Sequence, residues 1–125
     1  MLNQEIKLVT ESIQLLRVGK IFDEYELQAK IAAKFDKKGI RYDKEYQLGR
    51  GNRVDFLTES GIAVEVKKGK PNRTQLVEQI ERYAKFEEVK AVIIVVETSL
   101  RVPISLPIDK PCKVIGLQKL WGIAL

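Results

Sequence analysis

The spacing of the hydrophobic residues changes at Gly39, and this change constrains the fold more than any other feature of the chain. Before it, Leu27, Ile31 and Phe35 recur at a helical spacing, which predicts a helix over about 23–38 with the glycine as its C-terminal cap. After it, apolar and polar residues alternate over 40–48, as they do in strands. We therefore expect helices packed against a sheet.

The remaining pattern predicts further elements on either side of this change. Apolar residues at helical steps predict an N-terminal helix that begins at Leu2 and ends near Gly19. Strands are expected over 53–58, 62–68 and 91–96, a helix over 73–87 with Asn72 as its N-cap, and a strand with a short closing element over 113–125. The predicted fold class is mixed α/β. Its core is helix, three-strand meander, helix and strand, with the extra N-terminal helix and the C-terminal element around it.

Length and composition predict one domain over residues 1–125. The 125 residues contain no repeat or linker-like stretch, and 45% are hydrophobic, which suits a single core. No apolar run approaches the ~18 residues that a membrane-spanning helix needs, so no membrane partner is expected. The single cysteine, Cys112, cannot form a disulfide within the chain and favours a reducing, cytoplasmic compartment.

The absence of histidine excludes several classes of catalytic site. Zinc sites built on histidine, Ser-His-Asp triads and histidine-metal nucleases all need this residue. Hydrolytic chemistry would therefore rest on carboxylates, lysine and hard metal ions such as Mg²⁺ or Mn²⁺. The net charge of +5 favours a polyanionic partner such as DNA.

The turn Glu59-Ser60-Gly61 sets the register of a predicted hairpin. A three-residue loop commonly ends in a left-handed residue, a conformation that glycine adopts without strain. With the glycine in that position, Phe56 lies opposite Val64 and Asp55 lies opposite Glu65. The two carboxylates are therefore expected on one face of the hairpin, close to each other.

The same register divides the hairpin into a core face and a polar face. Lys67 follows Glu65 by two positions and shares the polar face with it and with Asp55. Two neighbouring carboxylates repel each other unless a cation lies between them, and their oxygens, with the Val66 carbonyl, suit Mg²⁺. Taken alone, Glu65-Val66-Lys67 is more typical of an ordinary strand with a solvated face. The core face is expected to hold Val54, Phe56, Ile62, Val64 and Val66.

This arrangement resembles the PD-(D/E)XK nuclease superfamily, whose core is a helix, a three-stranded meander, a helix and a strand. The family carries an Asp and then Glu-X-Lys on the next strand, which match Asp55 and Glu65-Val66-Lys67. The resemblance covers about residues 23–96, and Val54 stands where the family often has proline. It implies a Mg²⁺-dependent nuclease, with Mn²⁺ as a substitute, that hydrolyses DNA phosphodiester bonds. Asp55, Glu65 and the Val66 carbonyl would bind the metal, and Lys67 would position the attacking water.

The resemblance extends to both core helices. Many family members carry an acidic residue on the first core helix that assists the metal, and Glu24 matches it. Glu26 is the rival, roughly 160° around the helix, and a glutamate in a first turn is also favoured by the helix dipole alone. Gln79 and Tyr83 resemble the Gln-X-X-X-Tyr element of RecB-type nucleases, which borders the DNA backbone or the site. The alternative for this pair is a tyrosine at the edge of the core with a polar neighbour.

Basic residues lie in loops or at strand ends next to the predicted site. They are Arg50, Arg53, Lys68, Lys70 and Arg73. The phosphates of DNA would run past these side chains, although each one alone is more typical of a solvated surface. No pattern of aromatic and basic residues indicates an element that reads bases. We therefore expect recognition of the DNA backbone or of DNA structure.

Several alternatives remain open at this point. Within the nuclease class, the Gln79–Tyr83 pair favours RecB-like cleavage, the small size suits a homodimeric Holliday-junction resolvase, and a restriction-type endonuclease is a third option. Outside it, the alternatives are a catalytically inactive nuclease-fold module that binds nucleic acid, and a basic α/β interaction protein whose charges are all on the surface. The complete set of Asp55, Glu65 and Lys67 favours catalysis over both.

Overall fold

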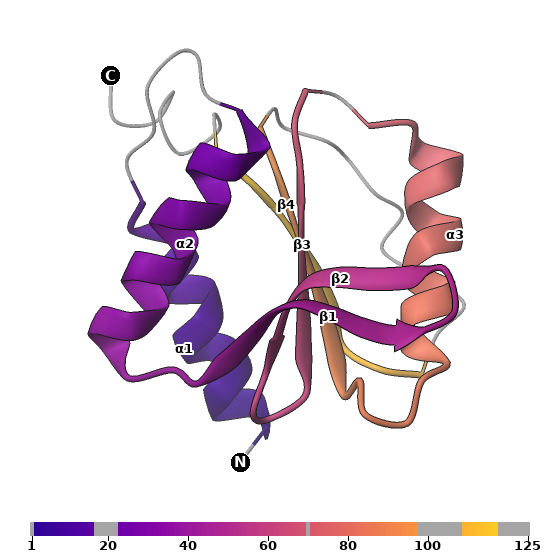
Figure 1. Ribbon diagram of the computed structural model, residues 1–125, viewed down its shortest axis with the longest axis horizontal. Helices are drawn as coiled ribbons and strands as arrows, with labels where there is room; N and C mark the ends of the chain where they lie inside the picture. Colours follow the sequence, from indigo (N-terminus) through magenta and orange to yellow (C-terminus); the bar gives the residue numbers. More distant parts are fainter. Residues whose placement is uncertain (1, 17–22, 70, 98–108, 118–125) are drawn as a thin grey trace.

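The computed structural model describes residues 2–16, 23–69, 71–97 and 109–117. Its fold is a five-stranded mixed sheet with helices on both faces (Figure 1). The strand order in the sheet is β1-β2-β3-β4-β5. The chain is therefore of the mixed α/β class, with a helix, three strands, a helix and a strand in the predicted order. Within the described ranges the elements are α1 (Leu2–Gln14), α2 (Glu24–Lys38), β1 (Tyr42–Gly49), β2 (Asn52–Thr58), β3 (Ile62–Lys67), α3 (Arg73–Ala84), β4 (Ala91–Val96) and β5 (Cys112–Gly116).

The sheet is antiparallel on one side of β3 and parallel on the other. β1, β2 and β3 form the predicted meander, whereas β3, β4 and β5 run parallel. α3 supplies the crossover from β3 to β4, because parallel neighbours cannot be joined by a tight turn. α1 and α2 cover one face of the sheet and α3 covers the other (Figure 1). β4 is therefore enclosed on both faces, and all of its residues are buried.

Polar caps fix the ends of the helices that flank the hairpin. The side chain of Asp23 accepts a hydrogen bond from the Glu26 N–H (2.7 Å) at the start of α2, and Gly39 ends this helix with a left-handed φ of 73°. Asn72 caps α3 in the same way, through the Gln75 N–H (3.0 Å). The predicted roles of Gly39 and Asn72 are both confirmed.

Two helices end earlier than their apolar spacing predicted. α1 ends at Gln14, before the expected end near Gly19, and α3 ends at Ala84, before residue 87. In both, the chain leaves the helix through a tighter turn, as in the bond from the Phe86 N–H to the Tyr83 carbonyl (3.2 Å). The expected last strand is β5, and the rest of the predicted tail, from residue 118, lies outside the described residues.

The β2–β3 hairpin has the predicted register next to its turn, but Asp55 and Glu65, which were predicted to lie opposite each other, are not among its pairs. Gly61 has a left-handed φ of 93° at the end of the turn. A Cβ at this position would lie 2.8 Å from the Glu88 carbonyl, so the turn needs glycine for its space as well as for its conformation. The pairs that β2 and β3 form are Phe56 with Val64 and Leu57 with Ala63.

Two apolar cores fill the two sides of the sheet. The α1/α2 core includes Ile13, Leu27, Ile31, Phe35, Phe56, Ile62, Val64 and Val66. The α3 core includes Val54, Leu57, Ala63, Leu76, Ile80, Tyr83 and Val92. Alternate residues of β3 point into different cores, as the pleat of a strand requires.

Val54 packs in the α3 core, which shows that its predicted place in the opposite core is wrong. Residues two apart on a regular strand share a face, so β2 changes face around Asp55. β1 changes face at the same level, because Tyr42 packs against the α1/α2 core and Tyr46 against the α3 core. Between them Glu45 has a φ of 52°, which is uncommon for a residue with a side chain. The β1–β2 ribbon thus bends at the residue predicted to bind metal.

Candidate active site

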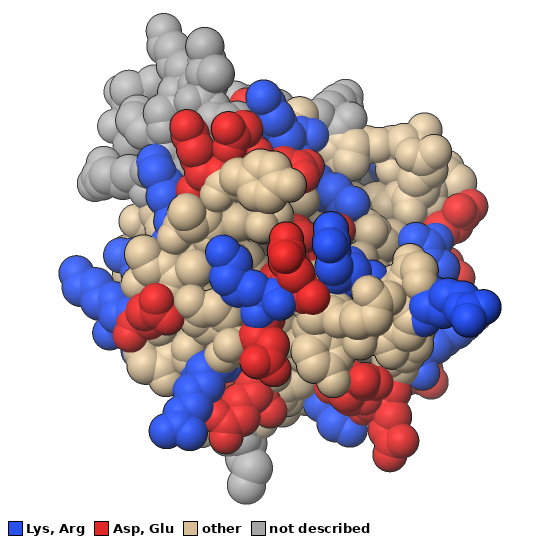
Figure 2. Space-filling model, viewed as in Figure 1, with Lys and Arg blue, Asp and Glu red and all other residues tan. Residues whose placement is uncertain are grey.

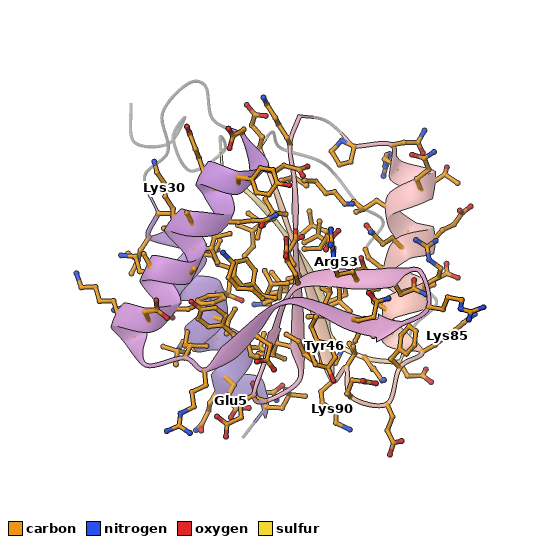
Figure 3. The ribbon with its side chains drawn as sticks, in the orientation of Figure 1. Glu5, Lys30, Tyr46, Arg53, Lys85 and Lys90 are labelled. Atoms are coloured by element: carbon orange, nitrogen blue, oxygen red, sulfur yellow. The ribbon has the colours of Figure 1, made fainter. Side chains whose placement is uncertain are left out.

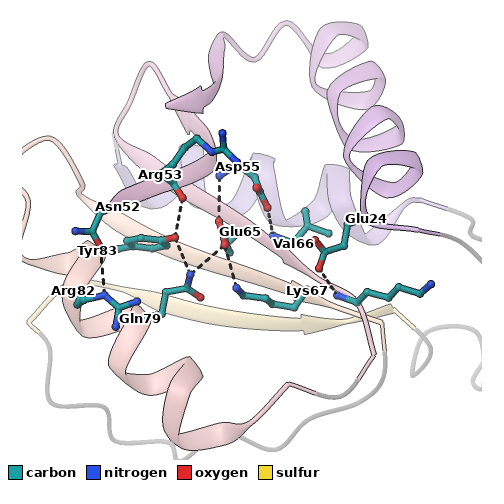
Figure 4. A network of polar contacts seen from close by, with 11 residues as sticks. Glu24, Asn52, Arg53, Asp55, Glu65, Val66, Lys67, Gln79, Arg82 and Tyr83 are labelled. Carbon is teal, nitrogen blue, oxygen red and sulfur yellow. Dashed lines mark hydrogen bonds and ion pairs between the residues drawn. The ribbon is translucent and has the colours of Figure 1, made fainter. Parts of the chain in front are cut away.

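β2 separates from β3 at Asp55, and carboxylate groups occupy the opening. Asp55 Oδ2 accepts a hydrogen bond from the Val66 N–H (2.7 Å), and the Asp55 N–H donates to Glu65 Oε1 (3.2 Å). Side-chain oxygens thus accept the hydrogen bonds that backbone carbonyls accept in a regular ladder. Figure 4 shows both acidic side chains together at this point of the sheet. The bend in β2 therefore brings each carboxylate to the backbone of the other strand.

Glu65 is buried, with 7% of its surface exposed, and several donors surround its carboxylate. Besides the Asp55 N–H on Oε1, Gln79 Nε2 and Lys67 Nζ each lie 3.2 Å from Oε2. Lys67 follows on the same strand, whereas Gln79 reaches across from α3 (Figure 4). Buried charges in proteins are normally paired in this way. Glu65 and Lys67 are therefore held in one arrangement on the α3 side of the sheet.

Asp55 is poorly stabilised as an anion. Burial, followed by the negative charge of Glu65, raises the pKa of Asp55 from 3.8 to about 7, and the charge of Glu24 acts in the same direction. The Val66 N–H and the Lys67 ammonium lower this pKa without compensating for the increase. A carboxylate in such surroundings gains from binding either a proton or a cation near neutral pH.

Gln79 and Tyr83 connect α3 to both strands of the hairpin. The nitrogen of Gln79 that contacts Glu65 also lies 2.9 Å from the Tyr83 hydroxyl, and this hydroxyl donates to the Arg53 carbonyl (3.0 Å). Burial, followed by the charges of Glu65 and Asp55, raises the pKa of Tyr83 above its ordinary value, so the hydroxyl keeps its proton. Both residues of the Gln-X-X-X-Tyr pattern therefore contact the site.

Glu24 reaches the end of β3 from the first turn of α2. Its Oε1 accepts a hydrogen bond from the Lys68 N–H (3.1 Å), and its charge contributes to the raised pKa of Asp55. Glu26 instead contributes its N–H to the N-cap of the same helix. These contacts favour Glu24 as the helix carboxylate near the site.

The oxygen donors at the bend are two carboxylates with backbone groups beside them. Within the ranges that the structure describes, no three side chains of the acidic or cysteine type converge as a complete set of metal ligands. Mg²⁺ commonly uses only one or two carboxylates and keeps several waters, so Asp55 and Glu65 are the residues that could hold it. Burial, followed by the charge of Glu65, raises the pKa of Asp55, so the anion of Asp55 is disfavoured in the free protein.

Glu97 is a neighbour of the site that the sequence pattern does not single out. Its Oε2 accepts a hydrogen bond from the Gly69 N–H (2.7 Å), and its own N–H donates to the Lys67 carbonyl (3.3 Å). Glu97 therefore holds the segment that follows Lys67 against the end of β4. No local motif marks this contact, because it depends on β3 and β4 being parallel neighbours.

The basic residues predicted to contact DNA come from different elements around the site. Arg50 lies in the β1–β2 turn, Arg53 in β2, Lys68 directly after β3 and Arg73 at the start of α3, and each is exposed. Lys70 lies outside the described residues. Arg53 projects between α2 and α3 (Figure 3). Acidic and basic side chains are interspersed over this face, without one continuous basic patch (Figure 2).

An open groove of about 400 Å³ borders the site on the α3 side. It shares Lys67 and Gln79 with the Glu65 contacts, so the groove and the carboxylates are neighbours. A slightly larger hollow, of about 420 Å³, lies at the β2–β3 turn beside α1 and includes none of these site residues. The groove is lined by Lys67, Pro71, Asn72, Gln75, Leu76, Glu78, Gln79 and Arg82.

Arg82 is a second neighbour of the site that was not predicted from the sequence. Its Nε donates to Asn52 Oδ1 (3.3 Å), which joins α3 to the start of β2. Arg82 lies three residues after Gln79, a spacing that places both on one side of a helix. That spacing was the signal available in the sequence.

No family model, curated protein or solved structure matches this chain. The family resemblance therefore stays a prediction, and function has to be inferred from the chemistry of the site. Of the helices described, none is long and apolar enough to cross a membrane.

Proposed function

We propose that the chain is a magnesium-dependent nuclease that hydrolyses phosphodiester bonds in DNA. The observation that carries this proposal is the Asp55–Glu65 pair at the bend of β2, with Lys67 3.2 Å from Glu65. The pKa of Asp55 is raised to about 7 by burial and then by the charge of Glu65. Such perturbed groups are concentrated at functional sites.

Mg²⁺ suits this set of donors, and Mn²⁺ prefers the same oxygen ligands. Asp55 and Glu65 would hold the ion, with the Val66 carbonyl and water molecules as further ligands. When bound, the ion would activate a water molecule and stabilise negative charge on the phosphate. Glu24 would assist from α2, through water or through the segment that follows Lys67.

Lys67 provides the positive charge that the protein itself brings to the reaction. Its ammonium group has three N–H donors, and the ion pair with Glu65 occupies only part of this capacity. The remaining donors would orient the attacking water and contact a phosphate oxygen. Negative charge that develops in the transition state would thereby be stabilised by a group already in position.

Gln79 and Tyr83 would act as positioning residues. Gln79 contacts Glu65 Oε2 at 3.2 Å, and Tyr83 fixes Gln79 while it donates to the Arg53 carbonyl. This chain of contacts sets the distance between α3 and the two strands that carry the carboxylates. Small errors in such distances reduce catalytic rates strongly.

DNA is the proposed substrate because the chain carries a net charge of +5 and exposed basic side chains surround the site. Arg50, Arg53, Lys68 and Arg73 would contact phosphates, which gives affinity without sequence specificity. The single cysteine accords with a cytoplasmic enzyme. The small size suits a homodimer.

A cleavage panel tests the proposal. Wild-type protein is incubated with linear, nicked, flapped and four-way DNA of one sequence, in Mg²⁺ and in excess chelator. Cleavage of at least one substrate in Mg²⁺, and of none in chelator, is the expected result. Binding without cleavage in either condition would contradict the proposal and would support a nucleic-acid-binding module instead.

A further inference from the structure

The groove beside the site changes in chemical character with distance from the carboxylates. Where it meets the site, its wall is Lys67 and Gln79, which both contact Glu65. One helical turn closer to the start of α3, Gln75 supplies an exposed amide and Pro71 supplies a half-buried apolar ring, whereas Leu76 lies beneath them with 2% of its surface exposed. The cations of the groove, Lys67 and Arg82, therefore lie at the level of Gln79 or beyond it along α3, whereas the end near the start of α3 carries neutral hydrogen-bonding groups and Pro71.

This sequence of groups matches a nucleotide better than it matches a second phosphate. The amide of Gln75 can donate and accept, as the edge of a nucleobase does, and the ring of Pro71 offers an apolar surface for one face of the base. Glu78 also lines the groove, next to Gln79 on α3, and its negative charge disfavours a second anion there. The volume of about 400 Å³ falls within the range of sites for small ligands.

A base can enter such a groove only when it is unpaired. In a duplex the edge of each base is hydrogen-bonded to its partner and its faces are stacked, and extruding it costs free energy. A single strand presents its bases at much lower cost, and proteins bind it by stacking on the base faces while cations hold the backbone.

We propose that this groove binds the base and sugar of one unpaired nucleotide next to the phosphate held near Lys67, so that single-stranded DNA is the preferred substrate class. This inference rests on the proposed nuclease function and adds the form of the DNA to it. Gln75 is the residue that would read the edge of the base.

The first test compares two leucine substitutions on adjacent exposed residues of α3. Gln75→Leu removes the amide from the groove, whereas Thr74→Leu alters a neighbour that does not line it. Binding of a labelled 12-nucleotide single strand and of its duplex is measured by fluorescence anisotropy in Ca²⁺. Wild type and Thr74→Leu should prefer the single strand, and Gln75→Leu should reduce this preference about fivefold to tenfold. An equal preference in Gln75→Leu and wild type would overturn the proposal.

The second test detects the nucleoside directly. The ¹⁵N-labelled protein is titrated with thymidine 5′-monophosphate, with thymidine and with inorganic phosphate. The side-chain amide signals of Gln75 should shift with both nucleoside ligands and remain in place with phosphate. Shifts with phosphate alone would show an anion site and overturn the nucleotide assignment.

Failure of the proposed function can be told apart from failure of this inference. Hydrolysis of bis(p-nitrophenyl) phosphate by wild-type protein in Mg²⁺ reports on the carboxylates with a substrate that has no base. Absence of this hydrolysis and of DNA cleavage, with single-strand binding that depends on Gln75, would contradict the nuclease proposal and support the groove. Hydrolysis together with single-strand binding that is indifferent to Gln75 would contradict the groove alone.

Discussion

At the scale of a single residue, opposing effects act on the charge of the Asp55 carboxyl group. Its carboxylate accepts the Val66 N–H at 2.7 Å, which favours the charged form, yet burial and the charge of Glu65 raise its pKa to about 7. The free protein therefore retains a proton there at mildly acidic pH. A metal ion would have to displace this proton, so metal affinity should increase as the pH rises through 7.

The raised pKa predicts how stability depends on pH in the absence of metal. Between about pH 4 and pH 7 the folded state binds the Asp55 proton and the unfolded state does not. The stabilisation of the folded state by this bound proton is therefore lost as the pH rises. Asp55→Asn removes the titration. In chelator, its melting temperature should exceed that of wild type by a few degrees at pH 8, with little or no advantage at pH 4.

Asp43→Asn is the matched control, because Asp43 is an exposed carboxylate on the neighbouring strand β1. Differential scanning calorimetry of the three proteins at pH 4, 6 and 8 provides the comparison. A melting-temperature difference between wild type and Asp55→Asn that stays constant over this range would show that Asp55 has no raised pKa.

At the scale of elements, the hairpin turn decides whether Asp55 and Glu65 meet. Gly61 has a φ of 93° and a Cβ there would lie 2.8 Å from the Glu88 carbonyl, whereas Gly51 has a φ of 77° with open space around it. Gly51→Ala should cost about 1–2 kcal/mol of unfolding free energy from conformation alone. Gly61→Ala should cost about 1–3 kcal/mol more, because the added methyl group is also overpacked. Urea denaturation measures both, and equal losses would argue against the close contact.

The link between α3 and the hairpin gives a prediction for catalysis. Tyr83→Phe removes the hydroxyl that contacts Gln79 and the Arg53 carbonyl. It should destabilise the fold by about 0.5–1.5 kcal/mol and reduce kcat while KM changes little, because Gln79 no longer holds Glu65 in place. Tyr25→Phe, at a residue that is 77% exposed, should change neither quantity. A kcat equal to that of wild type in Tyr83→Phe would show that Tyr83 has no positioning role.

The hairpin also shows what local sequence can and cannot predict. Its register follows from one glycine in one turn, and the structure confirms that register at Phe56 and Leu57. The place of Val54 could not be predicted from alternation, because the face change depends on the left-handed Glu45 of the neighbouring strand. No pattern of spacing signals a glutamate that adopts this conformation. The bend, and with it the opening at Asp55, becomes visible only in three dimensions.

At the scale of the whole molecule, the candidate site is assembled from distant segments. Glu24 comes from α2, Glu65 from β3, Gln79 from α3 and Glu97 from the end of β4. The order of elements was predictable, because hydrophobic periodicity and caps are local signals. The contact of Glu97 with Gly69 was not, since it depends on which strands become neighbours in the sheet.

Metal ions should change the thermal stability of the whole protein as well as its activity. Mg²⁺ and Mn²⁺ should raise the melting temperature at pH 8, because they bind only the folded arrangement of Asp55 and Glu65. Both ions should support cleavage, and Ca²⁺ should allow DNA binding with little turnover, since its looser coordination fits the site less well. A melting temperature indifferent to all three ions, combined with cleavage that survives chelator, would show that the carboxylate pair binds no metal.

The most direct test of the central claim is the rate of Mg²⁺-dependent DNA cleavage by variants of the carboxylate pair and its lysine. Asp55→Asn, Glu65→Gln and Lys67→Met should each reduce the rate by ~10²-fold or more while far-ultraviolet circular dichroism shows the wild-type fold. Glu59→Gln and Lys37→Met, at exposed positions away from the bend, serve as matched controls and should cleave at the wild-type rate. Near-wild-type cleavage by all three site variants would contradict the account, since no step of the proposed reaction could then depend on Asp55, Glu65 and Lys67.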